Sequence, residues 1–356
     1  MENAIRSAMT ALKPDFEEVG PERIKALLES QPETEGEVEV FDTVGGGAGA
    51  GASSGIVIFS ARVNGATNDY VLRYAPYNNE LRIFAEYDIA NQFHLHRILS
   101  ERGLPVPEPV ACDANSDCLP LPGFIMERVD GEVPDTSAYT TGLFAKASEA
   151  QRAKMHDGIF AALGQVHSVD WQRLGLEKYC CSAGGRTPIE RYLNWYWKTA
   201  EWSGFPSIDR LQRCRQWLFD NQPSYHSGEW TLVHGDANLA NYMFRNDRLV
   251  AILDWELAGI GSPSMDIALQ VNFNEYCRMA APPDVQNLIP TEQAWKTRYE
   301  KVTGRRLADY DYFRKLMCFT GLIILTSMNR GVPEAHKAAH AQGYEWLWAI
   351  VESGWN

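Results

Sequence analysis

The chain of 356 residues lacks the patterns of several protein classes. Its seven cysteines include no C-x-x-C pair, so we expect no structural zinc site. Their odd number and scattered positions fit a reducing compartment better than a disulfide framework. The longest apolar run, near Phe319 to Leu325, is too short to span a bilayer, and the N-terminal segment has no apolar core of signal-peptide length. We therefore expect a cytoplasmic protein with no membrane partner.

Positive charge is also scarce. The chain has 33 Lys and Arg residues against 46 Asp and Glu residues, a formal net charge of -13. A field of this sign repels nucleic acid, so we expect no nucleic-acid partner, although a local basic pocket for phosphates is compatible with it. Hydrophobic residues make up 45% and charged residues 22%, which predicts a folded chain long enough for two lobes.

Two nucleotide-binding motifs are absent from the glycine-rich segment Gly45–Gly55. It contains neither G-x-G-x-x-G nor G-x-x-x-x-G-K-[ST], which excludes the usual Rossmann and P-loop interpretations. Gly51–Gly55 does fit G-x-S-x-G, the nucleophile elbow of α/β hydrolases, but that elbow lies between a strand and a helix. Here a glycine run precedes the motif and a strand-like segment follows. A glycine loop between two strands instead lets backbone N–H groups approach phosphates closely.

The hydropathy pattern predicts a β-rich front and a helical back. Strands and one helix are expected in the front part, at Val38–Phe41, Ile56–Val63, Tyr70–Tyr74, Arg82–Arg102 (the helix), Val106–Ala111 and Gly123–Val129. The rest is predicted to be mainly helical, over Gln151–Val169, Ile189–Asn221, Thr291–Arg330 and Glu334–Glu352, with short strands within Thr231–Asp254. This order predicts an α+β fold with an N-terminal antiparallel sheet lobe over 1–129 and a larger, mainly helical C-terminal lobe over 130–356.

The segment Leu232–Asp254 carries the strongest chemical signal. Asp236 follows His234-Gly235 at the end of an apolar stretch, Asn241 comes five residues later, and Asp254 ends a second apolar run. A hairpin of this length can bring Asn241 and Asp254 together, and their oxygen ligands suit Mg²⁺. The Asp236 carboxylate beside them can orient an attacking hydroxyl or accept its proton.

The H-G-D-x-x-x-x-N segment and the following D-W-E resemble the aminoglycoside phosphotransferase and choline kinase family, which has a bilobal protein-kinase-like fold. The resemblance implies that Asp236 is the catalytic residue and that Asn241 and Asp254 bind the metal. It also implies ATP (or GTP) and Mg²⁺ as cofactors and a small-molecule acceptor with a hydroxyl group. Asp266 matches an acid that supports the catalytic loop in the family. We expect His167 and His234 to fix loops rather than act as bases.

The resemblance also implies a nucleotide site in the N-terminal lobe. The glycine loop would cover the phosphates, with hydrogen bonds from Ser53 or Ser54. Arg73, in the VLRYAP segment, resembles the arginine of phosphotransferase-like domains related to acyl-CoA dehydrogenase-associated kinases. A guanidinium there can clamp phosphate oxygens. Gln92, which cannot form an ion pair, occupies the family's glutamate position, so the acidic partner of Arg73 is either Glu86 or absent.

The segment leading to the interlobe hinge would bind the adenine. The resemblance assigns its edge to the main chain of Glu127 and Val129, with Met126 packing beside the base. The subfamily resemblance also suggests a hydroxyacyl thioester, such as a 4-hydroxyacyl-CoA, as the acceptor.

The helical segment Ile189–Trp202 is rich in aromatic residues. With Arg186, Arg191 and Lys198 it favours an anionic, apolar acceptor, although its aromatic residues fit core packing equally well. The alternative from another class is a nucleotide-binding pseudokinase with a regulatory or scaffold role. The departures at Arg73 and Gln92 favour it, and the intact Asp236, Asn241 and Asp254 set opposes it. The oligomeric state is not predicted.

Overall fold

The computed structural model describes residues 19–45, 53–76, 82–135, 138–224, 230–331 and 341–355. The chain divides into two compact units, and each is described here by itself. Unit 1 takes its described residues from Met1–Ser100, Pro107–Val129 and Ile324–Ala341, and unit 2 from Glu101–Val106, Asp130–Ile323 and Gln342–Asn356. The predicted assignment of nucleotide binding to 1–129 and catalysis to 130–356 stays a prediction.

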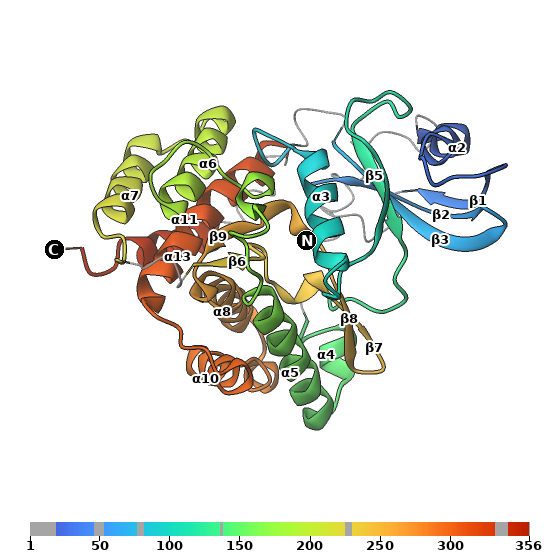
Figure 1. The fold of residues 1–356 in the computed structure, drawn as a ribbon. Coiled ribbons are helices and arrows are strands. Elements are labelled where there is room, and N and C mark those ends of the chain that lie inside the picture. The colour runs from blue at the N-terminus through green and yellow to red at the C-terminus, as the bar shows by residue number, and fades with distance from the viewer. Residues whose placement is uncertain are drawn as a thin grey trace. The chain divides into compact units, whose positions relative to one another are not determined.

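Unit 1 is built on a five-stranded antiparallel sheet in the order β1-β2-β3-β5-β4 (Figure 1). Its strands are β1 (Glu39–Gly45), β2 (Gly55–Val63), β3 (Ala66–Tyr74), β4 (Pro109–Asp113) and β5 (Gly123–Glu127). Alternate residues of β2, among them Val57, Phe59 and Ala61, are buried in the core of the unit. A two-residue turn with positive φ at Asn64 and Gly65 joins β2 to β3, as the right-handed twist of a hairpin requires.

Two helices of unit 1 pack against this sheet, α2 (Pro21–Glu29) and α3 (Ile89–Ser100). The predicted helix start at Arg82 is wrong, because Asp88 caps the helix. Its carboxylate accepts a 2.8 Å hydrogen bond from the backbone N–H of Asn91, so the first turn begins at Ile89.

The strand predicted at Val106–Ala111 lies further along the chain, as β4. The side chain of Asp113 explains where this strand ends. Its carboxylate accepts backbone hydrogen bonds of 2.6–2.8 Å from Asp117, Cys118 and Leu119, and so folds the following loop back on the strand.

Unit 2 is mainly helical. Its helices are α4 (Gly142–Lys146), α5 (Glu149–Val166), α6 (Pro188–Ser203), α7 (Ile208–Asp220), α8 (Pro263–Ala280), α9 (Pro283–Gln286), α10 (Glu292–Thr303), α11 (Tyr310–Met328, in this unit as far as Ile323) and α13 (Ala341–Val351). Its strands form two small antiparallel pairs, β6 (Thr231–Val233) with β9 (Gly259–Gly261) and β7 (Tyr242–Arg245) with β8 (Arg248–Ile252).

Several long helices begin at N-cap residues that can be recognised in the sequence. Ser148 forms a capping box with Gln151, and Thr187 and Thr291 accept backbone hydrogen bonds in the first turns of α6 and α10. The sequence reasoning missed α8, although Ser262 followed by proline at the first helical position is such a signal. The predicted helix over Glu334–Glu352 lies partly outside the described residues, and its described part is α13.

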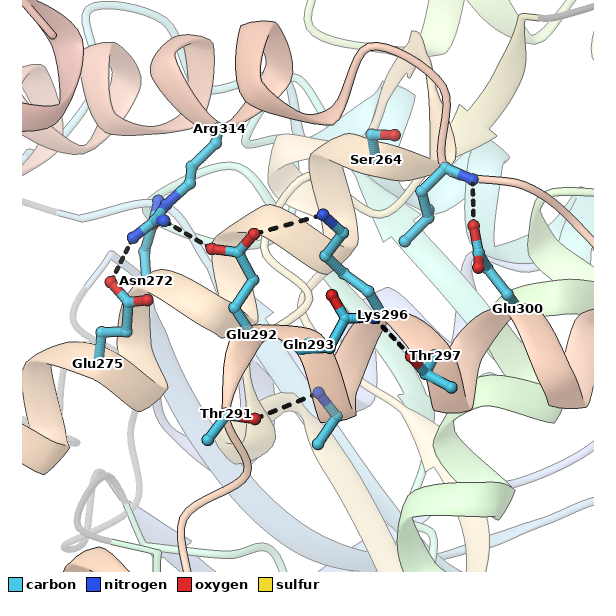
Figure 2. A network of polar contacts seen from close by, with 12 residues as sticks. Ser264, Asn272, Glu275, Thr291, Glu292, Gln293, Lys296, Thr297, Glu300 and Arg314 are labelled. Carbon is cyan, nitrogen blue, oxygen red and sulfur yellow. Dashed lines mark hydrogen bonds and ion pairs between the residues drawn. The ribbon is translucent and has the colours of Figure 1, made fainter.

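A network of ion pairs ties α8, α10 and α11 together (Figure 2). The guanidinium of Arg314 pairs with Glu275 of α8 and, at 2.7 Å, with Glu292 of α10, and Glu292 also binds Lys296 at 3.3 Å. Burial opposes the charge on Arg314, but Glu275 and Glu292 hold the pKa of Arg314 above its ordinary value. The network thus replaces the hydration that these partly buried charges lose.

In the described part of the chain, no helix combines the length and the apolar character needed to cross a membrane. All seven cysteines lie in described segments, and each is a free thiol.

Candidate functional site

The loop that follows β6 presents Asp236, and its path requires glycine at Gly235. This residue has φ of +80°, and a Cβ built on it would lie 1.9 Å from the carbonyl oxygen of Leu257. Any other side chain would push the loop away from the segment that follows Asp254. The glycine in His-Gly-Asp is therefore a steric requirement of this loop.

Two amide side chains orient the carboxylate of Asp236. Asn238 donates a 2.8 Å hydrogen bond to Oδ1, and Asn241 donates one of 2.7 Å to Oδ2 and one of 2.8 Å to the backbone oxygen. Burial and the charge of Asp254 raise the pKa of Asp236 above its ordinary value, against the effect of these hydrogen bonds. A carboxylate with a raised pKa is a better proton acceptor at neutral pH.

The β7–β8 hairpin brings Asn241 next to Leu253, the residue that precedes Asp254. Its strands pair Tyr242 with Ile252, and just beyond this pair the backbone N–H of Leu253 donates a 2.8 Å hydrogen bond to the carbonyl oxygen of Asn241. Asp254 follows in the left-handed region, with φ of 65° and ψ of 64°. This conformation is costly for a non-glycine residue and is typical of functional positions.

Asp266, at the start of α8, holds the loop that presents Asp236 and is fully buried. Its two oxygens accept hydrogen bonds of 2.9 Å from the backbone N–H groups of His234 and Gly235. His167 binds the same carboxylate at 3.0 Å, and Tyr299 binds the other ring nitrogen of His167 at 2.8 Å. Burial would raise the pKa of Asp266, but the hydrogen bond from His167 and the backbone donors hold it below its ordinary value. His167 therefore acts on the loop through Asp266.

His234 connects the two acidic loops. Its Nε2 lies 2.8 Å from the carbonyl oxygen of Leu253, and its Nδ1 accepts a 3.2 Å hydrogen bond from the backbone N–H of Asp236. Because Nδ1 accepts, Nε2 carries the proton and donates it to Leu253. Both ring nitrogens are thus used in fixing the loops, as expected for a positioning residue.

The donor set at Asn241 and Asp254 fits a hard divalent cation. Asn241 turns its amide nitrogen toward Asp236, which leaves its carbonyl oxygen as the donor to a cation. The carboxylate of Asp254 is near enough to raise the pKa of Asp236, and a bound cation would offset this repulsion. Among the described residues, no group of three or more His, Cys, Asp or Glu side chains can hold a metal. An ion here would therefore draw further oxygens from water or phosphate.

The predicted phosphate-binding residues of unit 1 lie at the start of β2 and on β3. Ser53 and Ser54 are buried just before β2, and most of the predicted glycine loop, 46–52, lies outside the described residues. A Cβ on Gly55 would lie 2.1 Å from the ring of Tyr74, its partner across the β2–β3 pair. Arg73 is also buried, next to Tyr74 on β3. Because a strand follows Gly51–Gly55, the α/β-hydrolase elbow is excluded.

The other residues predicted for the nucleotide site lie before α3 and at the end of β5. Glu86 was expected on the helix, but it is exposed and precedes α3. Gln92, at the position where the family has glutamate, lies on α3 and is buried. Met126 and Glu127 end β5 and Val129 follows it. The N–H of Glu127 donates a 2.8 Å hydrogen bond to the carbonyl oxygen of Glu108, so this N–H is already used within the unit.

The aromatic helix α6 packs mainly into the core of unit 2. Tyr192, Trp195 and Tyr196 are buried. Arg191 pairs with Glu177, its Nε lying 2.6 Å from the carboxylate, and Arg186 pairs with Glu190 at 3.4 Å. These pairs neutralise two of the cations on which the expectation of an anionic acceptor rested.

Sequence reasoning missed Asn238 and Gln270. Asn238 belongs to the motif segment, and a second amide side chain two residues after the predicted catalytic acid was the signal available. Gln270 lies on α8 and lines a pocket beside the catalytic loop. Nothing in its sequence neighbourhood predicts this position, because α8 itself was missed.

This arrangement is that of a phosphotransferase, and the comparison with known families agrees. Residues 59–293, well over half of the chain, match the model of the phosphotransferase enzyme family. The chain belongs to this family. The predicted enzyme class and the resemblance to the phosphotransferase-like domains of acyl-CoA dehydrogenase relatives are thus confirmed.

One curated relative is acyl-CoA dehydrogenase family member 11 of Homo sapiens. It is 30% identical over 234 residues, which cover 62% of this chain and 29% of that protein. The chain thus spans less than a third of the length of this relative.

Solved structures confirm the predicted α+β, kinase-like fold. A protein of Ralstonia eutropha JMP134, described as an aminoglycoside phosphotransferase, superposes with a TM-score of 0.68 over 95% of this chain and 99% of its own, at 22% identity. Amicoumacin kinase in complex with AMP-PNP and Ca²⁺ gives a TM-score of 0.55 over 91% of this chain and 90% of its own, at 15% identity. At these identities the likeness concerns the fold.

Proposed function

We propose that the chain is an ATP- or GTP-dependent small-molecule kinase that transfers the γ-phosphoryl group to an acceptor hydroxyl. The arrangement around Asp236 carries the proposal. Two asparagine amides orient its carboxylate, and one of them, Asn241, is held beside Asp254 by the backbone. Family membership supports the reaction class, and the AMP-PNP complex of amicoumacin kinase supports the nucleotide.

The residues divide the chemistry between them. Asn241 and Asp254 would hold Mg²⁺, which when bound neutralises charge on the transferring phosphates. Asp236 orients the acceptor hydroxyl and accepts its proton at a carboxylate oxygen. Arg73, Ser53 and Ser54 would hold the phosphates. Catalysis of this kind is mainly positioning and charge stabilisation.

The same proposal extends to the rest of the nucleotide site and to the acceptor. Met126, Glu127 and Val129 would bind the base, and Glu86 would support Arg73. The relative named for acyl-CoA dehydrogenases supports a hydroxyacyl-CoA as the acceptor. The cytoplasmic location stays a prediction.

The test is Mg-dependent release of ADP from ATP, with hydroxyacyl-CoAs, amino alcohols and aminoglycosides as acceptors. We expect one acceptor class to stimulate turnover, and Asp236→Ala to lower kcat by about 10²- to 10⁴-fold, because that is the usual contribution of a positioned acid or base. Asn221→Ala, an exposed amide at the end of α7, is the control. Nucleotide binding without turnover on any acceptor, equal in wild type and Asp236→Ala, would favour the pseudokinase alternative.

A further inference from the structure

A pocket lies beside the catalytic loop, wholly within unit 2. It is partly enclosed and partly open to solvent. Its walls come from the loop after Asp236, from the middle of α8 and from the segment before α4, and include Tyr139, Asn238, Leu239, Gln270, Phe273 and Cys277. We call it the α8 pocket.

Asn238 connects the α8 pocket with the carboxylate of Asp236. Asn238 lines the pocket and also donates its 2.8 Å hydrogen bond to Asp236. Its own Oδ1 accepts a 2.9 Å hydrogen bond from the backbone N–H of Ala240, so its position is fixed from both ends. A molecule in this pocket therefore contacts a residue that is hydrogen-bonded to Asp236.

The lining of the α8 pocket suits an uncharged ligand. Leu239 and Phe273 supply apolar surface, and the hydroxyl of Tyr139 is hydrogen-bonded to His156, which leaves the tyrosine ring to the pocket. Among the described lining residues, Asp135 is the single charged side chain. The pocket therefore offers no cation for a phosphate and too few acids for a polycation.

Gln270 adds one specific polar feature. It is buried, with an exposed fraction of 3%, and its Nε2 donates a 2.8 Å hydrogen bond to Asn274. Its Oε1 accepts no hydrogen bond from the described residues. A buried acceptor left in this state is costly, and a carboxamide rotates easily about its last torsion. A ligand with an amide N–H or a hydroxyl in the pocket can supply the missing donor.

The apolar surface continues beyond the pocket along α8. Phe273, Tyr276 and Met279 follow one another at a spacing of three residues and are 43%, 38% and 44% exposed. Residues at this spacing lie on one face of a helix. A ligand chain longer than the pocket thus finds further apolar contact next to Phe273.

We propose that the α8 pocket binds the uncharged, largely apolar portion of the acceptor, with Gln270 as the hydrogen-bond acceptor and Phe273 as the apolar wall. This inference rests on the proposed kinase function and narrows its substrate class. Polycationic acceptors are excluded from the pocket, and the charged end of an anionic acceptor binds outside it.

The experiment compares Gln270→Leu and Phe273→Ala with wild type, using a short-chain and a long-chain 4-hydroxyacyl-CoA as probes. Gln270→Leu removes the hydrogen bond, and Phe273→Ala changes an exposed residue that folding tolerates. Gln293→Leu, at an exposed position on α10, is the matched control. The readouts are KM for each probe, KM for ATP, kcat and acceptor-independent ATP hydrolysis.

We expect both variants to raise KM for the long-chain probe about 3- to 10-fold, the usual worth of one neutral hydrogen bond or apolar contact. KM for ATP and acceptor-independent hydrolysis should stay at the wild-type values. Stimulated turnover with an unchanged probe KM in both variants overturns the pocket assignment and leaves the kinase function standing. Stimulation of the wild type by amino alcohols or aminoglycosides but by neither hydroxyacyl-CoA also overturns the pocket assignment and leaves the kinase function standing. Absence of stimulated turnover with all three acceptor classes overturns the kinase function, and the pocket assignment with it.

Discussion

Asn238 donates a 2.8 Å hydrogen bond to Oδ1 of Asp236 and, together with Asn241, fixes the rotation of this carboxylate. We predict that Asn238→Ala lowers kcat about 10- to 100-fold, because a hydrogen bond to a charged group is worth roughly 1.5–3 kcal/mol. KM for the nucleotide should change little. Steady-state kinetics with a productive acceptor measure both constants. An unchanged kcat in Asn238→Ala would contradict the positioning role.

Alanine substitutions at Gly235 and Gly204 should destabilise the protein to different degrees. Both have positive φ, +80° and +67°, but a Cβ meets the carbonyl oxygen of Leu257 at 1.9 Å in the first case and nothing within 4 Å in the second. Gly204→Ala should cost about 1 kcal/mol of unfolding free energy from the backbone alone. Gly235→Ala should cost clearly more and abolish turnover. Thermal unfolding measures the stability lost in each variant, and the difference between them gives the cost of the clash with Leu257. Equal losses of stability would show that the loop moves to relieve this clash.

His156 should make stability depend on pH. Burial, with Arg298 next in effect, lowers its pKa from the ordinary 6.5 to about 3, and its Nε2 is hydrogen-bonded to the hydroxyl of Tyr139 at 3.1 Å. Below pH 6.5 the unfolded chain binds a proton at this residue that the folded chain does not bind. Stability contributed by the neutral imidazole is therefore complete above pH 6.5 and is lost progressively as the pH falls toward 3, by about 1.4 kcal/mol per pH unit.

Urea unfolding from pH 7 downward measures this loss. His156→Gln can still accept from Tyr139 but does not titrate, so its stability should fall less steeply with decreasing pH than that of the wild type. His94→Gln, at a half-exposed position, is the control. Parallel curves for the wild type and His156→Gln would exclude a buried neutral histidine.

The network around Arg314 should stabilise unit 2. Arg314→Met removes the partner of Glu275 and Glu292 and leaves both carboxylates partly buried. We expect a loss of roughly 1–3 kcal/mol of unfolding free energy, which added salt should not reproduce in the wild type. Arg186→Met is the control, since Arg186 is 92% exposed and its pair with Glu190 should contribute less than about 1 kcal/mol. Equal effects of the two substitutions would show that the network is only a surface contact.

The arrangement of the segment around Asp236 could be predicted because its residues are close together in the sequence. Asp236, Asn241 and Asp254 lie within one loop and one hairpin, so their spacing along the chain already implies their meeting in space. The antiparallel sheet of unit 1 followed from alternation and turn residues in the same way. His167 was recognised as a structural residue, but its route to the loop through Asp266 depends on α8, which was missed.

Features that depend on distant packing were not predictable. The predicted helix start at Arg82 was wrong because Asp88 caps the helix. Glu86 therefore precedes the helix and does not lie on it. The sequence of α6 does not show whether its aromatic residues face the core or a ligand. In the structure Tyr192 and Tyr196 are buried in the core. The α8 pocket joins residues more than a hundred positions apart, which no local pattern indicates.

The β7–β8 hairpin sets how far apart the two predicted metal donors stand. Asn241 and Asp254 flank its open end, and a two-residue turn with positive φ at Asn246 and Asp247 closes the other. Lengthening both strands equally would therefore move the turn outward and leave the donors where they are, whereas one extra residue in a single strand would shift one donor against the other. Length variation in this hairpin should thus be tolerated in matched steps, so that the tip can diverge between family members while the donor spacing is kept.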